Sequence, residues 1–250
     1  MTPKTASLIP VIVLALALIG TAVAGDQTND LWPESGIFSG PEPMSYYLEL
    51  RNILLGEHNN RLCQLFVLPS FDPEWTVYVV RDDETKGEAQ VIFKSMKSNL
   101  WHKMLGQIME NTPGNVFSFG EESQKPALAQ LNKPIDRATV TISESTVTLL
   151  EQVWSEMLSR VHYTKLEEDK DEMTIILDGT GYHISHYYQK WAGTRSGSTY
   201  SPEKGSNPYA LVQLGYELRR YAIANEKDLP QIENTIIDKA NALLEKLKKE

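Results

Sequence analysis

Short strand patterns alternate with amphipathic helical patterns along this chain, and no strand–helix–strand crossover repeats. Parallel sheets need such crossovers, because the end of one parallel strand lies far from the start of the next. Neighbouring strands that are joined by short turns form antiparallel hairpins instead. The order of the patterns therefore predicts an α+β fold, in which amphipathic helices cover an antiparallel sheet built from hairpins.

The individual elements are predicted from the spacing of apolar residues. Alternation with a period of two indicates a strand, and a period near 3.6 indicates a helix. Strands are predicted at residues 62–68, 75–81, 89–94, 137–142, 173–177 and 182–188. Helices are predicted at residues 44–55, 99–110, 143–161, 207–224 and from Pro230 onward. Residues 111–134 have only a weak pattern and carry no prediction.

The first 24 residues have the features of a cleavable secretory signal. Lys4 gives a positive start, residues 8–19 are apolar apart from Pro10, and small residues lead to Ala24. The apolar stretch is shorter than the roughly 20 residues that a membrane-spanning helix needs. We expect cleavage after Ala24, a periplasmic or secreted location, and no stable membrane insertion of the remaining chain. The alternative is an uncleaved membrane anchor.

The rest of the chain is expected to comprise an extended leader and one domain. Residues 25–43 are rich in Gly, Pro, Ser, Asp and Asn, which is typical of extended chain. Residues 44–250 are long enough for a single α+β domain. An alternative division has two helix–hairpin–helix halves, at residues 44–112 and 135–250. The formal net charge of −9 disfavours a nucleic-acid partner, because nucleic-acid binding depends on neutralising phosphates.

Cysteine and histidine give no sign of a disulfide, a metal or a cofactor. Cys63 is the one cysteine, so it forms no internal disulfide, and its apolar surroundings suit a small buried side chain. His183 and His186 are three residues apart on a predicted strand and would therefore point to opposite faces. The remaining histidines have no ligand spacing. We expect no metal and no cofactor.

The segment Asp178-Gly179-Thr180-Gly181 is predicted to be the turn of the last hairpin. Its apolar strand and acidic turn are similar to motifs of aspartic proteases and haloacid dehalogenases. Gly179 interrupts the Asp-Thr-Gly of the first family, and the nucleophilic Asp of the second would fall at Ile176, so both families are rejected. As a turn, the segment sets Ile175 opposite Ile184 on a core face. His183 is then expected on the more exposed face.

The candidate binding region follows this turn. Glycine, hydroxyl and basic residues of the predicted loop at residues 191–206 lead into the helix that begins at Asn207 and Pro208. Free N–H groups at a helix start, together with Arg195 and Lys204, would favour an anion. The alternative is a surface loop in front of a capped helix. The candidate binding residues are His183, Ser185, Tyr187, Trp191, Arg195, Tyr200, Lys204, Ser206 and Asn207.

These features favour an exported, non-enzymatic binding or interaction protein of the bacterial envelope. It would be inhibitor-like, immunity-like or ligand-binding, and its partner would be a protein, a peptide or an anionic small ligand. Aromatic side chains that are apolar with a polar tip suit such contacts. The alternative is a small periplasmic hydrolase with His183 as general base. A purely structural envelope component is a third class.

Overall fold

The structure is a computed structural model that describes residues 29–33, 44–56, 58, 60–81, 88–111, 121–161, 179–188 and 193–250. The predicted signal peptide lies outside these residues, as does most of the predicted leader. In chain order the elements are α3 (Met44–Leu55), β1 (Gln64–Pro69), β2 (Trp75–Arg81), β3 (Ala89–Met96), α4 (Leu100–Asn111), α5 (Glu121–Gln130), β4 (Ile135–Ile142), α6 (Glu144–Ser159), β5 (Thr180–Tyr188), β6 (Gly193–Tyr200), α7 (Asn207–Ala222), the 3-10 turn η3 (Glu226–Asp228) and α8 (Leu229–Leu247).

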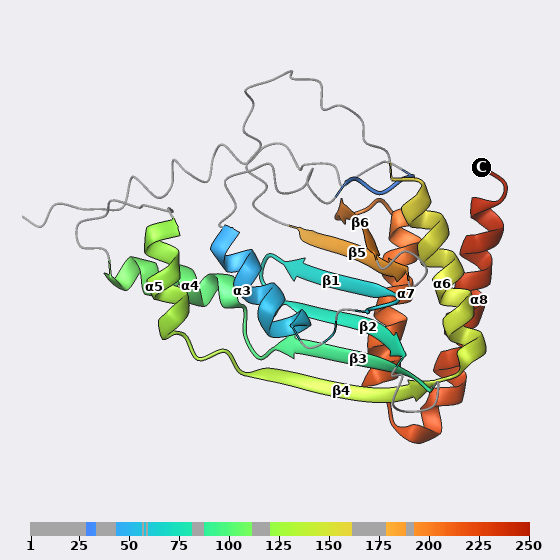
Figure 1. Cartoon of the computed structure of the whole chain (residues 1–250), viewed down its shortest axis with the longest axis horizontal. Coiled ribbons are helices and arrows are strands. Elements are labelled where there is room, and N and C mark those ends of the chain that lie inside the picture. The colour runs from blue at the N-terminus through green and yellow to red at the C-terminus, as the bar shows by residue number, and fades with distance from the viewer. Residues whose placement is uncertain are drawn as a thin grey trace, which may run out of the picture.

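The six strands form one sheet in the order β4-β3-β2-β1-β5-β6, and every neighbouring pair is antiparallel (Figure 1). The predicted α+β fold is therefore confirmed. β2 and β3 form the predicted hairpin, with Val79 opposite Val91. None of the described helices is both long and apolar enough to cross a membrane.

The predicted partner of residues 182–188 is wrong. β5 pairs with β1 along one edge and with β6 along the other, so that Ile184 lies opposite both Leu65 and Gly197. A strand has only two hydrogen-bonding edges, and neither is left for the predicted register with Ile175. Residues 173–178 lie outside the described residues. The prediction failed because it considered only the nearest strand pattern in the sequence, whereas β1 comes from much earlier in the chain.

Residues 193–200 were predicted as part of a loop and form the edge strand β6 instead. Their Gly, Ser and Thr content is typical of loops, which explains the error. Pairing with β5 supplies the backbone hydrogen bonds that a loop of this composition would take from water. The small side chains also suit an edge against which other segments pack closely.

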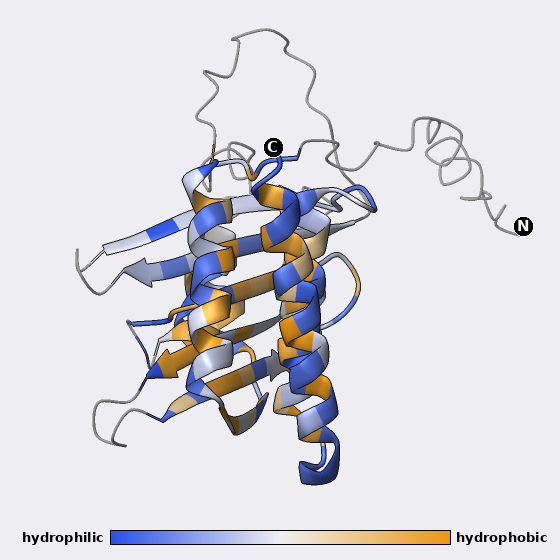
Figure 2. Cartoon of the chain, turned by 90° about the vertical axis from the view of Figure 1, so that its right-hand side faces the viewer, coloured by the Kyte–Doolittle hydropathy of each residue, from blue (hydrophilic) through white to orange (hydrophobic). Residues whose placement is uncertain are grey.

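Helices α6, α7 and α8 cover one face of the sheet, and Figure 2 looks onto this layer with strands passing behind the helices. Valine, leucine and isoleucine of alternate strand positions meet the apolar stripes of the helices. α7 lies close against the sheet at Gly215, where an added Cβ would lie 2.2 Å from Leu65 Cδ2. This face contains the larger of the two clusters of buried apolar residues among the described residues.

Helices α3, α4 and α5 form a second core on the opposite face. Phe66, Tyr78 and Ile92 of the sheet pack there against Leu50 of α3 and Met104 of α4. No prediction had been made for α5. Its first half is charged and polar, it contains Pro126, and its described buried residues are few, so the helical period is hard to see in the sequence.

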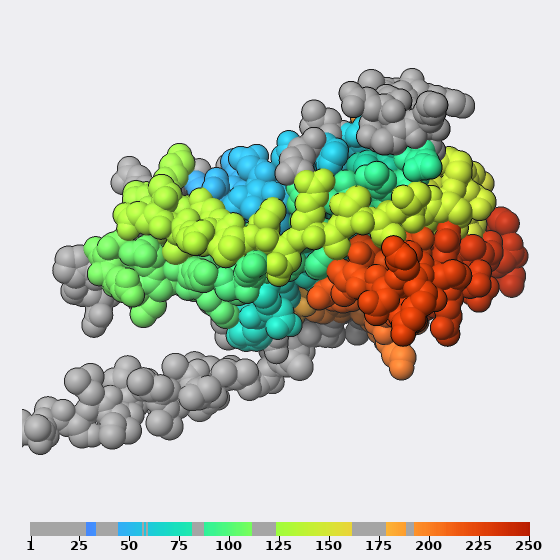
Figure 3. Space-filling view, turned by 90° about the horizontal axis from the view of Figure 1, so that it is seen from below, coloured from blue at the N-terminus to red at the C-terminus, as the bar shows by residue number. Residues whose placement is uncertain are grey.

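The two edges of the sheet are β4 and β6. Figure 3, viewed from below, shows β4 as a ridge along the surface beside the helices of the C-terminal part. Most β4 side chains are exposed or half-buried, which is expected of a strand with one neighbour.

Candidate functional site

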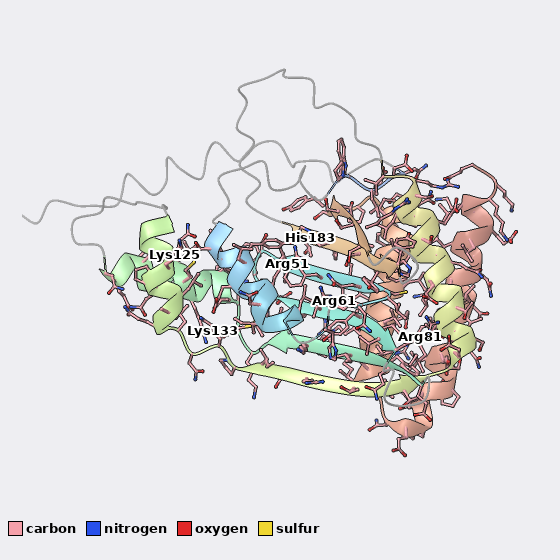
Figure 4. The ribbon with its side chains drawn as sticks, viewed as in Figure 1. Arg51, Arg61, Arg81, Lys125, Lys133 and His183 are labelled. Carbon is pink, nitrogen blue, oxygen red and sulfur yellow. The ribbon has the colours of Figure 1, made fainter. Side chains whose placement is uncertain are left out.

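His183 is not on an exposed face. It is 3 % exposed, and its ring centroid lies 5.5 Å from that of Tyr47 and 6.0 Å from that of Phe66. Figure 4 shows His183 beside α3, the helix that carries Arg51. The alternation of β5 was interpreted correctly, because His183 and Ile184 do face opposite sides. The error was to expect water on the side that α3 covers.

The predicted binding residues fall into separate places. Ser185 and Tyr187 share the α3 face of β5 with His183, where Ser185 is buried and Tyr187 half-buried. Arg195 lies opposite His186 and therefore on the other face, where its guanidinium stacks 5.4 Å over the ring of Tyr188. Trp191 lies outside the described residues. The sheet thus separates Tyr187 from Arg195.

Tyr200, Lys204, Ser206 and Asn207 lie near the start of α7. Tyr200 lies against Gly179, where a Cβ would be 2.0 Å from the tyrosine oxygen. Ser206, not Asn207, caps α7, since its Oγ accepts a hydrogen bond from the N–H of Tyr209 at 3.2 Å. Lys204 is exposed. The helix begins at Asn207 as predicted, with Ser206 before it as the capping residue.

The predicted anion position beside α7 is filled by the chain itself. Asn207 is fully buried, and its Nδ2 donates to Oε2 of Glu250 at 2.7 Å. Arg160 lies 3.4 Å from the same oxygen. The Glu250 carboxylate thus provides negative charge at the first residue of α7, and the cation beside it is Arg160. The sequence-based prediction had instead named Arg195 and Lys204 as the cations at this position.

Basic side chains on the α3 side of the sheet are also bound internally (Figure 4). Lys133 contacts Glu49 at 2.5 Å, and Arg61 donates to the Gln64 side chain at 2.6 Å and to a backbone carbonyl. Burial and the nearby Arg51 lower the pKa of Arg61. Because these cations already have acceptors, they do not make this face a site for an external anion.

A groove of about 850 Å³ lies on the opposite side of the sheet, between α6 and the C-terminal end of α8, with the last residues of β5 at its base. We call it the α6–α8 groove. Its size is within the range of about 300–1,000 Å³ that is common for ligand sites. The lining residues are Thr148, Glu151, Gln152, Ser155, Glu156, Arg160, His186, Tyr188, Leu244, Leu247, Lys248 and Glu250.

His186 lines this groove with a neutral imidazole ring, which a hydrogen bond holds in a fixed orientation. Its Nδ1 contacts the backbone carbonyl of Leu62, which can only accept, so Nδ1 carries the proton and Nε2 keeps a lone pair. Burial lowers the pKa of His186, although the hydrogen bond to Leu62 opposes the shift. The ring meets Tyr188 edge to face at 4.5 Å. His186 is 4 % exposed, so it contributes a small part of the surface of the groove, next to the half-buried Tyr188.

Protonation of His186 is expected to make folding weaken as the pH falls. Its folded pKa lies below its ordinary value of 6.5, so below about pH 6.5 the unfolded chain binds this proton more readily. The stability that neutral His186 provides is present above pH 6.5 and declines toward pH 5. Urea unfolding at several pH values, compared with His186→Gln, isolates this contribution. A stability difference between the two proteins that does not change from pH 8 to pH 5 would contradict the assignment.

Charges in the α6–α8 groove largely compensate one another. Glu151 contacts Arg81 at 2.7 Å, and hydrogen bonds from Glu151 and Glu144 raise the pKa of that arginine. Arg160 contacts Glu156 at 3.1 Å as well as Glu250. The uncharged part of the lining is a set of hydroxyl, amide and imidazole groups with two leucines.

Two groups of the kind used in acid–base or nucleophilic catalysis line this groove, and each has a hydrogen-bond partner within the chain. Ser155 accepts a hydrogen bond from the Tyr188 hydroxyl at 3.2 Å, and His186 uses Nδ1 for a backbone carbonyl. Cys63 is fully buried, and burial raises its pKa, so it remains a thiol. In the described part of the chain no group of three or more His, Cys, Asp or Glu is arranged to hold a metal ion.

The fold and the groove define an α+β protein with an open groove of mixed polar and apolar lining between two helices and the end of a sheet. Comparisons with protein-family models, curated proteins and solved structures find no match to this chain. The function of the groove is therefore argued from its geometry.

The two residues that β5 contributes to the groove could have been found from the sequence, because alternation places His186 and Tyr188 on the same face as Tyr182 and Ile184. The contributions of α6 and α8 have no such local signal.

Proposed function

We propose that this is an exported, non-enzymatic binding protein of the bacterial envelope, and that it holds a polypeptide segment of a protein partner in the α6–α8 groove. The observation that carries this proposal is the groove itself, where an aromatic pair, His186 and Tyr188, lies among hydroxyl, amide, charged and aliphatic side chains. The signal-like first 24 residues support export. An inhibitor-like or immunity-like role is one form of this function.

Charge favours a neutral or basic segment over an anionic small ligand. The groove has three carboxylates, of Glu151, Glu156 and Glu250, and two cations, of Arg160 and Lys248. The whole chain has a formal net charge of −9. The charges in the groove itself largely cancel, because Glu151 is paired with Arg81 and Arg160 lies beside Glu156 and Glu250. A negative ligand would therefore meet repulsion mainly at longer range, from the net charge of the whole chain.

The alternative of a hydrolase with His183 as general base has little geometric support. A general base must reach the substrate proton directly or through one water molecule. The His183 ring is enclosed between Tyr47 and Phe66 and is 3 % exposed. A substrate would reach it only if α3 moved away from the sheet.

The test is capture of a partner from an envelope extract with the wild-type protein and two single-residue variants. Tyr188→Ala removes an aromatic side chain from the groove, and we expect about 10- to 30-fold weaker binding of the captured partner, typical of an interface aromatic residue. Tyr187→Ala is the matched control. It removes the same side chain one residue earlier, on the opposite face of β5.

Titration of the purified partner against each variant gives the binding constants, and circular dichroism confirms that the fold is retained. Equal weakening by Tyr187→Ala and Tyr188→Ala would reject the groove as the site. Tighter binding of the partner's acidic segments than of its neutral or basic ones would reject the argument from charge.

A further inference from the structure

The outer edge of β6 is paired with a segment from the start of the described chain. The N–H of Trp32 donates to the carbonyl of Ser198 at 2.9 Å, and the N–H of Ser198 donates back to the carbonyl of Trp32 at 2.8 Å. The Ser198 hydroxyl also donates to the Pro33 carbonyl at 3.2 Å. In Figure 1 this short segment lies next to β6, although the two are far apart in the sequence.

A pocket at this edge receives the side chain of Leu31. Leu31 is 2 % exposed and belongs to the core beneath α6, α7 and α8. The pocket exists because position 197 is glycine, where an added Cβ would lie 3.0 Å from both Leu31 Cβ and Val161 Cγ2. A glycine within a strand often marks a place where another backbone approaches closely. Gly197 has that role here.

This arrangement has both features of peptide binding by strand addition, in which a peptide pairs with the edge of a sheet as an extra strand. Backbone hydrogen bonds at a sheet edge give affinity without regard to sequence, and a pocket beneath every second residue gives specificity. Within the described residues, Trp32 makes one isolated bridge to an edge strand of eight residues. A longer extended segment would pair with more of β6 than residues 29–33 do.

We propose that the outer edge of β6 is a peptide-binding site, and that residues 29–33 are its internal occupant. The external partner is an extended polypeptide segment that places an aliphatic side chain over Gly197 and pairs with β6 on either side of Ser198. This site is separate from the α6–α8 groove, and it stands whether or not that groove binds a partner.

The internal segment is held weakly enough to be displaced. Among the described residues, the contacts that hold it are the backbone hydrogen bonds between Trp32 and Ser198 and the buried side chain of Leu31. Its main advantage is that it belongs to the same chain, which gives it an effective concentration on the order of millimolar. A partner segment must overcome this advantage with additional backbone pairs. Removing the internal competitor should therefore make even a short peptide bind measurably.

The probe is a labelled synthetic peptide with the sequence of residues 27–34, Gln-Thr-Asn-Asp-Leu-Trp-Pro-Glu. Fluorescence anisotropy measures its binding to the purified wild-type protein and to Leu31→Asp. The aspartate expels the internal segment, because an ionised carboxylate is not tolerated in an apolar pocket. We expect at least tenfold tighter binding to Leu31→Asp than to wild type. Leu31→Ala gives a smaller effect in the same direction and replaces Leu31→Asp if that variant does not fold.

The matched control adds Gly197→Val to the Leu31 variant, which fills the pocket and should abolish peptide binding. Amide hydrogen exchange at Ser198 gives a second readout, with fast exchange in the Leu31 variant and restored protection when the peptide is added. Equal peptide binding to wild type and Leu31 variants would overturn the proposal, as would binding that survives Gly197→Val. Tyr188→Ala should leave peptide binding unchanged, so failure here is distinguishable from failure of the groove.

Discussion

Replacing Trp154 by alanine is expected to lower the free energy of unfolding by about 3–5 kcal/mol, the usual range for a large buried aromatic residue. Trp154 is fully buried on the sheet-facing side of α6. Its indole N–H donates to the carbonyl of Gln64 at 3.2 Å, which ties α6 to the first residue of the central strand β1. Alanine would leave a cavity and an unpaired carbonyl between the helix and the sheet.

Chemical denaturation monitored by circular dichroism measures this loss. Trp154→Phe is the informative companion, because it keeps most of the apolar volume and removes the N–H. We expect the phenylalanine variant to lose about 1–2 kcal/mol, which separates the hydrogen bond from the packing. If alanine costs less than about 1 kcal/mol, Trp154 does not join α6 to the sheet as described.

The second large effect is expected at Glu74, a fully buried carboxylate at the start of α4. It accepts hydrogen bonds from the N–H groups of Leu100 and Trp101, at 2.9 and 3.1 Å, and from the Tyr46 hydroxyl at 2.5 Å. Glu74 therefore joins α3, α4 and the sheet. Glu74→Ala leaves three buried donors without this acceptor, at about 1–3 kcal/mol each, so a loss of at least about 3 kcal/mol is expected.

Two further variants separate this role from ordinary capping of α4. Asn99→Ala removes the acceptor for the N–H of His102 and should cost about 1 kcal/mol, as N-cap replacements do. Glu74→Gln retains one acceptor oxygen and should fall between wild type and alanine. Hydrogen exchange should show the first-turn amides of α4 losing protection in Glu74→Ala. Unchanged exchange at Leu100 and Trp101 would disprove the role given to Glu74.

Periodic apolar residues were enough to predict most helices and their inward faces. In the last helix the apolar residues at helical spacing are all buried, and these are Ile232, Ile236, Ala240, Leu243 and Leu247. The apolar residues at the same spacing in α6 are buried as well, and these are Val147, Leu150, Trp154 and Leu158. These predictions succeed because a helix that packs on one side repeats its apolar residues every three to four positions, whatever it packs against.

The candidate site was predicted less well, because burial depends on segments that are distant in the sequence. Alternation correctly put His183 and His186 on opposite faces of β5, but it could not show that α3 covers His183. It likewise could not show that the core ends near His186, where α6 and α8 leave a groove. The binding residues predicted from residues 182–207 are therefore distributed over two faces and one helix end.

The sequence by itself determined the class of fold, the positions of most elements and the alternation of side chains along each strand. Only the tertiary structure decided that β5 pairs with β1, that β6 is a strand, and that Glu250 supplies the negative charge beside α7. The physical reason is the distance along the chain over which each feature is determined. The period of the apolar residues in a helix or strand indicates which side of that element is buried. The partner of a strand and the helix that covers it depend instead on contacts between residues far apart in the chain.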